Sequence, residues 1–173
     1  MNGLEAIRKK SISYLSFRIG NEVFASHVSH VNNIVEVTKI TKIPNAPDYM
    51  MGVINLRGQV LPVVDTRVRL GMNPTEVSTN TCILVLEVES GEGIQQIGGM
   101  VDSVKEVLEL KEDDILPPPR IGKMTSQTFI SGVAHRNDDF ILIVDMNELF
   151  NGADLVDFAK EVKRVKEEIA VDE

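Results

Sequence analysis

The sequence of 173 residues has no tryptophan, and aromatic residues make up only 5% of it. Aliphatic side chains must then supply most of the buried volume, so the 43% hydrophobic content predicts a core of valine, isoleucine, leucine and methionine. A chain of this length and content can bury such a core as one domain or as two small ones.

Cysteine is almost absent as well. The single Cys82 cannot form an internal disulfide, so nothing points to an oxidising compartment. No apolar run approaches the roughly 20 residues that span a bilayer. The basic residues Arg8-Lys9-Lys10 are followed by no continuous apolar stretch, so no signal peptide is predicted. We therefore expect a cytoplasmic protein without direct membrane insertion.

Basic residues are too few for a typical nucleic-acid-binding protein. The 18 lysines and arginines stand against 26 acidic residues, a formal net charge of -8, which argues against nucleic acid and anionic membranes as partners. The charge is unevenly placed: residues 36–69 hold five basic and three acidic residues, whereas residues 87–114 hold nine acidic and two basic ones. This asymmetry favours docking of charged partners, although a solvated acidic face is the commoner explanation.

Signatures of catalysis and of metal binding are missing. His27 and His30 are three residues apart, but no HExxH arrangement or nearby third ligand accompanies them. The glycines at 91, 93, 98 and 99 fit no phosphate-binding motif. Cys82 lies in the apolar run TCILVL, where burial raises a thiol pKa, so packing is favoured over nucleophilic catalysis. We predict no catalytic residue, no cofactor and no metal, and a small cysteine-dependent hydrolase using Cys82 is a much less favoured alternative.

The stretch GVINLRGQVLPVVD, residues 52–65, has the pattern of a β-hairpin. Two apolar runs flank Arg57-Gly58, and glycine readily adopts the positive φ that a tight turn requires. Arg57 is therefore predicted to lie at the tip, where solvent or a partner reaches it. The apolar strand of this hairpin ends at Asp65.

Two segments of the chain recur later in it. At an offset of 73, VSHVNNIVEV (28–37) matches VDSVKEVLEL (101–110), with apolar residues at five common positions. At an offset of 80, Gly52-Val53 matches Gly132-Val133, and the Asp65 strand end matches Asp145. Two matches in the same order predict an internal duplication into two similar β units. Because Asp65 and Asp145 recur symmetrically, a structural cap is favoured over paired acid-base catalysis.

The expected boundaries follow from the duplication. The join between the units is predicted near residues 71–79, and residues 1–11 form an N-terminal extension. Residues 153–169 are predicted to form an amphipathic helix, because their apolar residues follow a 3,4,3,4 spacing: Leu155, Phe158, Val162, Val165 and Ile169. Packing on a barrel is favoured over a coiled-coil dimer for this helix, since two heptads are short for a free-standing coil.

The two hairpin tips differ where the strands agree. The first tip reads Asn55-Leu56-Arg57-Gly58, whereas the second reads His135-Arg136-Asn137-Asp138-Asp139. Polar residues are ordinary at a turn, but a leucine predicted to be exposed beside a cation is not. Because loops specialise while duplicated strands keep their packing, the first tip is the candidate binding site.

These segments resemble the CheW-like chemotaxis coupling proteins, a family that shares its domain with the regulatory region of the chemotaxis histidine kinase. GVINLRGQVLPVVDTR is similar to the most distinctive segment of that family, and IPNAPDYMMGVINLRG, VDSVKEVLEL, ISGVA and ILIVDMNELF follow its order. The resemblance covers a single domain, residues 12–150. It implies a mainly β fold of two SH3-like five-stranded β-barrels around a shared apolar core, and no catalysis.

The resemblance also implies which residues bind partners. They are residues of the first repeat at the NLRG segment and near it, and residues of the second barrel edge that resembles the kinase-facing side: Val31, Asn33, Gly52, Asn55, Leu56, Arg57, Gly58, Ile130 and Gly132. Many members of the family have a glutamate where this chain has Asn33, and that glutamate can pair with the hairpin arginine. Here either Glu36 replaces it, or Arg57 is held by hydrogen bonds alone.

The function implied is that of a cytoplasmic, non-enzymatic adaptor. Its expected partners are the regulatory domain of a chemotaxis histidine kinase and the helical cytoplasmic tip of a chemoreceptor, and the chain is expected to be monomeric alone. An adaptor for a non-chemotactic sensory kinase or a pilus system is the alternative that the residues do not separate from it.

Overall fold

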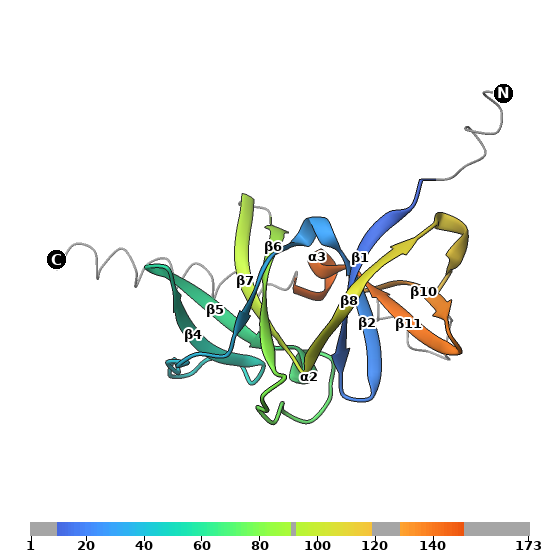
Figure 1. The fold of residues 1–173 in the computed structure, drawn as a ribbon. Coiled ribbons are helices and arrows are strands. Elements are labelled where there is room, and N and C mark those ends of the chain that lie inside the picture. The colour runs from blue at the N-terminus through green and yellow to red at the C-terminus, as the bar shows by residue number, and fades with distance from the viewer. Residues whose placement is uncertain (1–9, 91–92, 119–128, 151–173) are drawn as a thin grey trace.

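The computed structural model describes residues 10–90, 93–118 and 129–150, which form two β-sheets side by side (Figure 1). The first sheet has six strands in the order β8-β1-β2-β11-β10-β9: β1 (Ile12–Ile19), β2 (Glu22–His27), β8 (Ser103–Leu110), β9 (Ile115–Leu116), β10 (Ile130–Arg136) and β11 (Asp139–Val144). The second has five strands in the order β3-β6-β7-β5-β4: β3 (Val31–Glu36), β4 (Met50–Leu56), β5 (Gln59–Asp65), β6 (Cys82–Ser90) and β7 (Gly93–Val101).

Short helical turns lie between these strands or follow the last of them. They are η1 (Val28–His30), α2 (Thr66–Arg69), η2 (Glu112–Asp114) and α3 (Met146–Phe150). Neighbouring strands are antiparallel except for the pairs β2–β11 and β5–β7, which are parallel. Among the described strands, the two edges of neither sheet pair with each other, so both barrels are open. The predicted mainly β, SH3-like fold class is confirmed, with the two-residue strand β9 added to one of the five-stranded units.

The duplication is visible in the order of the strands. When β8, β1, β2, β11 and β10 are replaced by their counterparts β3, β6, β7, β5 and β4, the order of one sheet becomes that of the other. Equivalent backbone bonds repeat too: the Asp65 amide donates to the Tyr49 carbonyl, and the Asp145 amide to the Phe129 carbonyl, both at 2.7 Å. The strand order and these bonds both support the internal duplication that the sequence predicts.

The two sheets are not formed by the two halves of the chain. The hairpin β1–β2 pairs with strands of the second repeat, and the hairpin β6–β7 pairs with strands of the first. Each repeat therefore gives its first hairpin to the other repeat. The segment 71–79, where the sequence predicts the join between the two repeats, connects β5 to β6 within the five-stranded sheet. The similarity between the two halves of the sequence locates the repeats but does not show which strands pair.

The main apolar core lies between the sheets and draws side chains from both. Phe17 of β1, Leu86 of β6 and Phe150 of α3 are each at most 1% exposed and belong to one cluster. A smaller cluster fills the interior of each sheet. The shared core implied by the family resemblance is thus present.

Two aspartates close equivalent strand ends. The Asp65 carboxylate accepts from the Arg67 amide at 3.1 Å and caps α2, and the Asp145 carboxylate accepts from the Asn147 amide at 3.0 Å at the start of α3. The structural role expected for both residues is confirmed. The helix expected over 153–169 and most of the extension 1–11 lie outside the described residues.

Candidate partner-docking site

The tip of the β4–β5 hairpin is a two-residue turn with a fixed shape. Arg57 has φ of 53° and Gly58 has φ of 83°, and Leu56 pairs with Gln59 across them. Two positive φ values in a two-residue loop are the geometry of a type I′ turn, whose twist matches that of the strands. The Asn55 side chain strengthens the turn, because its Oδ1 accepts from the Gly58 amide at 2.8 Å.

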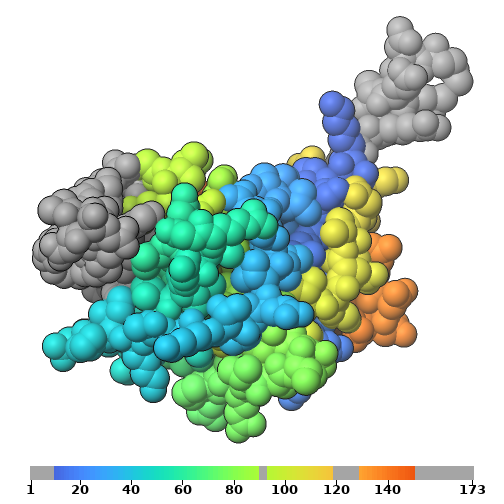
Figure 2. Space-filling view, turned by 60° about the vertical axis from the view of Figure 1, so that its left-hand side comes forward, coloured from blue at the N-terminus to red at the C-terminus, as the bar shows by residue number. Residues whose placement is uncertain are grey.

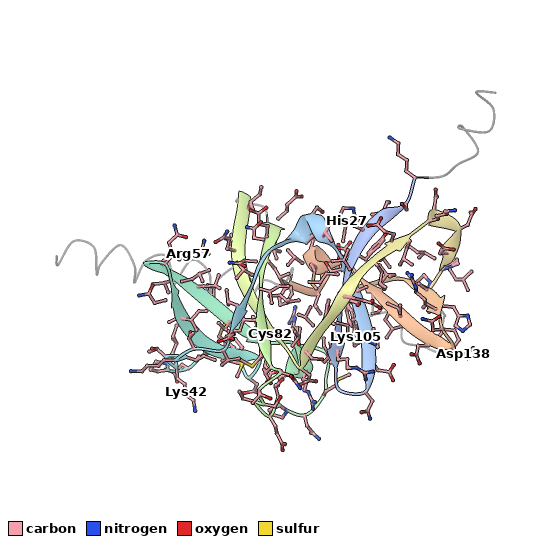
Figure 3. The ribbon with its side chains drawn as sticks, in the orientation of Figure 1. His27, Lys42, Arg57, Cys82, Lys105 and Asp138 are labelled. Atoms are coloured by element: carbon pink, nitrogen blue, oxygen red, sulfur yellow. The ribbon has the colours of Figure 1, made fainter. Side chains whose placement is uncertain are left out.

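Arg57 stands at the apex of this turn and is exposed (Figure 3). Its side chain forms no ion pair or hydrogen bond with the part of the chain that the structure describes. Figure 3 places Arg57 and Asp138, which mark the two hairpin tips, at opposite ends of the molecule. Within the described residues, therefore, nothing occupies the five N–H donors of this guanidinium.

Glu36, the acidic residue offered as a partner for Arg57, lies away from it. Glu36 ends β3, which is one edge strand of the five-stranded sheet, whereas the hairpin strand β4 is the other edge. Glu36 pairs along the backbone with Cys82, and the described residues contain no ion pair between it and Arg57. The Asn33 Oδ1 accepts from the Ile34 amide at 2.8 Å, a local contact. The substitution by Glu36 that the sequence left open is therefore not made.

Leu56 is half-buried, which corrects the expectation of an exposed leucine at the tip. Side chains alternate along β4, so Leu56 shares a face with the buried Ile54 and packs against the interior cluster of the five-stranded sheet. Asn55 points the other way and is exposed. The exposed surface of the tip is accordingly polar and cationic: Asn55, Arg57, Gly58 and Gln59.

Gly52 and Gly132 are buried and occupy equivalent positions in the two repeats. A Cβ on Gly52 would lie 2.2 Å from the Thr41 carbonyl oxygen, and one on Gly132 would lie 2.4 Å from Ile115 Cγ2. In both repeats a neighbouring segment crosses close to the strand, as the bridge between Thr41 and Val53 shows. These glycines shape the hairpins and offer no surface of their own.

Val31 and Ile130 are half-buried residues at the starts of β3 and β10. Both pack against the core that lies between the sheets. The structure brings residues 55–58 together at one tip, but Val31 and Asn33 lie on the opposite edge strand, and Ile130 lies in the other sheet.

Several apolar residues are exposed on the surface, which the sequence did not predict. Ile34 of β3 is 43% exposed and Val107 of β8 is 57% exposed, and these two residues match each other in the duplication. Phe140, at 62% exposure, lies near the second tip, where its ring contacts His135. Ile34 and Val107 are exposed because they lie on edge strands. An apolar residue type alone does not show whether its strand is at the edge or in the core of a sheet.

Two clusters of like charge lie on different parts of the molecule. Lys39 and Lys42, both exposed, lie in the segment 37–49 that runs beside the β4–β5 hairpin (cyan and teal in Figure 2). Exposed acidic residues follow β8 and η2 of the other sheet: Glu106, Glu109, Glu112, Asp113 and Asp114. The Arg57 tip thus belongs to the more basic end of the molecule.

The candidates for other chemistry are weak in the structure. Burial raises the pKa of the Cys82 thiol, and a hydrogen bond from the Val104 backbone offsets part of that effect. A raised pKa disfavours the thiolate that nucleophilic catalysis needs. The His27 and His30 rings are 6.4 Å apart, but no group of three metal-ligating side chains occurs within the described ranges. No helix in those ranges is long and apolar enough to cross a membrane.

A family model described as the CheW-like domain matches residues 13–154. The chain belongs to the CheW-like domain family. It is 36% identical over 136 residues to Chemotaxis protein CheW of Rhizobium meliloti, an alignment that covers 79% of this chain and 85% of the relative. It is 29% identical over 142 residues to Chemotaxis protein CheW of Klebsiella aerogenes, which covers 82% and 83%.

A solved structure of the same family supports the fold. The crystal structure of the scaffolding protein TtCheW from Thermoanaerobacter tengcongensis matches with a TM-score of 0.72 and 31% identity, covering 84% of this chain and 95% of that one. The CheW-like family inferred from the NLRG segment and its neighbours is confirmed.

Proposed function

We propose that this protein is a non-enzymatic adaptor of a chemotaxis signalling assembly. It joins the regulatory domain of a chemotaxis histidine kinase to the helical cytoplasmic tip of a chemoreceptor. Support comes from the family, whose relatives carry the names of chemotaxis and scaffolding proteins, and from a fold that offers exposed tips and edges. Catalysis has no part in this role.

The strongest support for this role is a difference in residue type between the two equivalent hairpin turns. Both tips place two residues at positive φ: Arg57 and Gly58 in the first, Asn137 and Asp138 in the second. Asparagine, aspartate and glycine are the residues that tolerate this conformation best, whereas an arginine there is uncommon. The arginine is therefore better explained by what it binds than by the turn itself.

Charge at the tip orients the partner, and apolar contact supplies affinity. The exposed Arg57 meets an acidic or carbonyl-rich surface of the receptor tip. The exposed apolar residue Ile34, with Val31 and Asn33 beside it, lies on the other edge strand of the same sheet and offers a second contact to the partners. The strand carrying Ile130 in the six-stranded sheet belongs to the side that docks the kinase.

The test replaces Arg57 with the residue that the second tip uses. Arg57→Asn removes the charge and keeps a residue suited to positive φ, and Arg57→Glu reverses the charge. We expect the Asn variant to bind the receptor tip fragment about three- to tenfold more weakly and the Glu variant more weakly still. Thermal unfolding of both variants measures whether the fold is intact.

The matched control is Asp138→Asn, which changes one charge in the turn of the second tip. It is expected to leave receptor binding unchanged. If Arg57→Asn and Arg57→Glu both bind kinase and receptor as the unaltered chain does, Arg57 is a turn residue only. If the unaltered chain binds neither partner, the adaptor role in chemotaxis is wrong, and the alternative of a non-chemotactic sensory kinase or a pilus system takes its place.

A further inference from the structure

Because the two sheets are related by duplication, the interior residues of one can be compared position by position with those of the other. Leu15 of β1 pairs with Val107, and Leu84 of β6 pairs with Ile34, which is the repeat counterpart of Val107. Leu15 and Leu84 are therefore equivalent, and so are the residues that precede them, Tyr14 and Ile83. By the same registers, His27 beside Tyr14 is equivalent to Met100 beside Ile83.

The two interiors differ at these matched positions. In the five-stranded sheet Ile83 and Met100 are both 0% exposed and belong to one aliphatic cluster. In the six-stranded sheet Tyr14 and His27 take their places, with ring centroids 5.7 Å apart in an edge-on contact. Ala134 occupies the position of Ile54, which removes three carbons from the interior. One sheet is thus filled with aliphatic side chains, while the other is partly polar and has less side-chain volume.

A pocket of about 420 Å³ lies on the six-stranded sheet, and Tyr14 is part of its lining. This volume falls within the range of small-molecule sites in proteins. Its lining combines aliphatic side chains, one phenol and one charge of each sign: Ile12, Leu110, Ile115, Tyr14, Lys10 and Glu112. Because the opposite charges of Lys10 and Glu112 offset each other, the pocket has no net preference for an ion.

The phenol in the pocket has no hydrogen-bond partner among the described residues. Tyr14 is 8% exposed, yet its hydroxyl makes no hydrogen bond with any residue that the structure describes. The hydroxyl oxygen itself reaches the surface, so a group from outside the chain can bond to it. Burial also raises the pKa of Tyr14, so the hydroxyl keeps its proton at neutral pH and can both donate and accept.

We propose that this pocket of the six-stranded sheet binds a small uncharged amphipathic molecule. Its apolar body packs between Ile12, Leu110 and Ile115, and its one polar group meets the Tyr14 hydroxyl. A small molecule fits better than a polypeptide segment, because two of the lining residues, Tyr14 and Leu110, are themselves members of the sheet's interior cluster. The site is separate from the Arg57 tip and stands whether or not the adaptor role holds.

Indole is a suitable probe, since it has an apolar body and one N–H that the Tyr14 oxygen can accept. The full chain, labelled with ¹³C at isoleucine and leucine methyl groups, is titrated with indole and followed by NMR. We expect saturable shifts confined to Ile12, Leu110 and Ile115, with a Kd on the order of 1 mM for a ligand of this size. Tyr14→Phe, which removes only the hydroxyl, is expected to weaken binding about three- to tenfold.

A matched pair of variants separates this pocket from general stickiness. Ile12→Ser alters the pocket wall, and Ile34→Ser alters a similarly exposed isoleucine, at 39% and 43% exposure respectively. Both are expected to fold, and only Ile12→Ser is expected to lose binding. Shifts spread over both sheets, or equal loss in both variants, overturn the proposal. Shifts of the pocket methyls with the kinase regulatory domain but not with indole would assign the pocket to a protein side chain instead.

Discussion

Arg67 and Asp102 form a two-pronged ion pair across the junction of the two sheets. The Arg67 Nε lies 2.9 Å from Asp102 Oδ2 and 3.1 Å from Oδ1, and its terminal NH2 lies 2.9 Å from Oδ2. Asp102 sits where the chain passes from β7 of one sheet to β8 of the other, and Arg67 belongs to α2. The carboxylate also accepts from the Gly20 amide in the β1–β2 turn. One side chain therefore ties three segments together.

Removing this carboxylate should destabilise the fold measurably. Arg67 and Asp102 side chains are 27% and 18% exposed, so solvent screens the pair only in part. We expect Asp102→Asn to lower the free energy of unfolding by about 1–3 kcal/mol, because charge-assisted hydrogen bonds are lost. Urea denaturation of this variant, of Arg67→Gln and of the double variant measures the coupling between the two residues.

The control for that cycle is Asp138→Asn, which removes a charge at an exposed turn. Its effect is expected to stay within about 0.5 kcal/mol. Purely additive losses from Asp102→Asn and Arg67→Gln would contradict a direct stabilising interaction between the two side chains.

Gly52 is predicted to be irreplaceable by alanine. Its φ is +140°, and a Cβ would lie 2.2 Å from the Thr41 carbonyl oxygen, a backbone atom that cannot move without breaking the bridge to Val53. We expect Gly52→Ala to cost more than about 3 kcal/mol of unfolding free energy. Gly58→Ala is the comparison, because φ is +83° but nothing lies within 4 Å of its Cβ position. A cost of about 1 kcal/mol is expected there, and similar Tm values for the two variants would refute the steric argument.

Because the Cys82 thiol is partly buried, we predict that the protein loses stability at alkaline pH. Burial raises its pKa above the ordinary value of 9.0, so above that pH the unfolded chain gives up the proton first and binds fewer protons than the native chain. The free energy of unfolding is therefore undiminished below pH 9 and falls as the pH rises through the folded pKa. Tyr14, whose pKa is raised by burial above 10.0, adds to the fall at higher pH.

Urea denaturation at about pH 7, 9 and 10 measures this dependence. Cys82→Ala is expected to flatten the decline between the two higher values, while Tyr14→Phe leaves that part of the curve in place. The same burial predicts slow reaction of Cys82 with thiol reagents in the native protein and fast reaction in urea. Rapid labelling of Cys82 in the native protein at neutral pH would support the alternative of a cysteine-dependent hydrolase.

Local chemistry was readable from the sequence, whereas long-range pairing was not. The Arg57-Gly58 turn and the capping roles of Asp65 and Asp145 follow from residue types and spacing, and the structure has all of them. Leu56 was misjudged because its burial depends on which face of β4 meets the interior. The tie between Arg67 and Asp102 links residues 35 positions apart on different elements. No pattern along the chain indicates that contact.

The exchange of hairpins between repeats predicts that neither half of the chain folds alone. A cut after residue 75, in the connection between β5 and β6, leaves β1–β2 in one fragment and its neighbours β8 and β11 in the other. It also separates β5 from its parallel partner β7. Each fragment then lacks the strands that cover its apolar surface and should give a poorly dispersed amide NMR spectrum. Coexpressed fragments 1–75 and 76–173 should assemble one to one and recover the spectrum of the intact chain. Native-like dispersion from either fragment by itself would mean that the join predicted near 71–79 does separate two folding units.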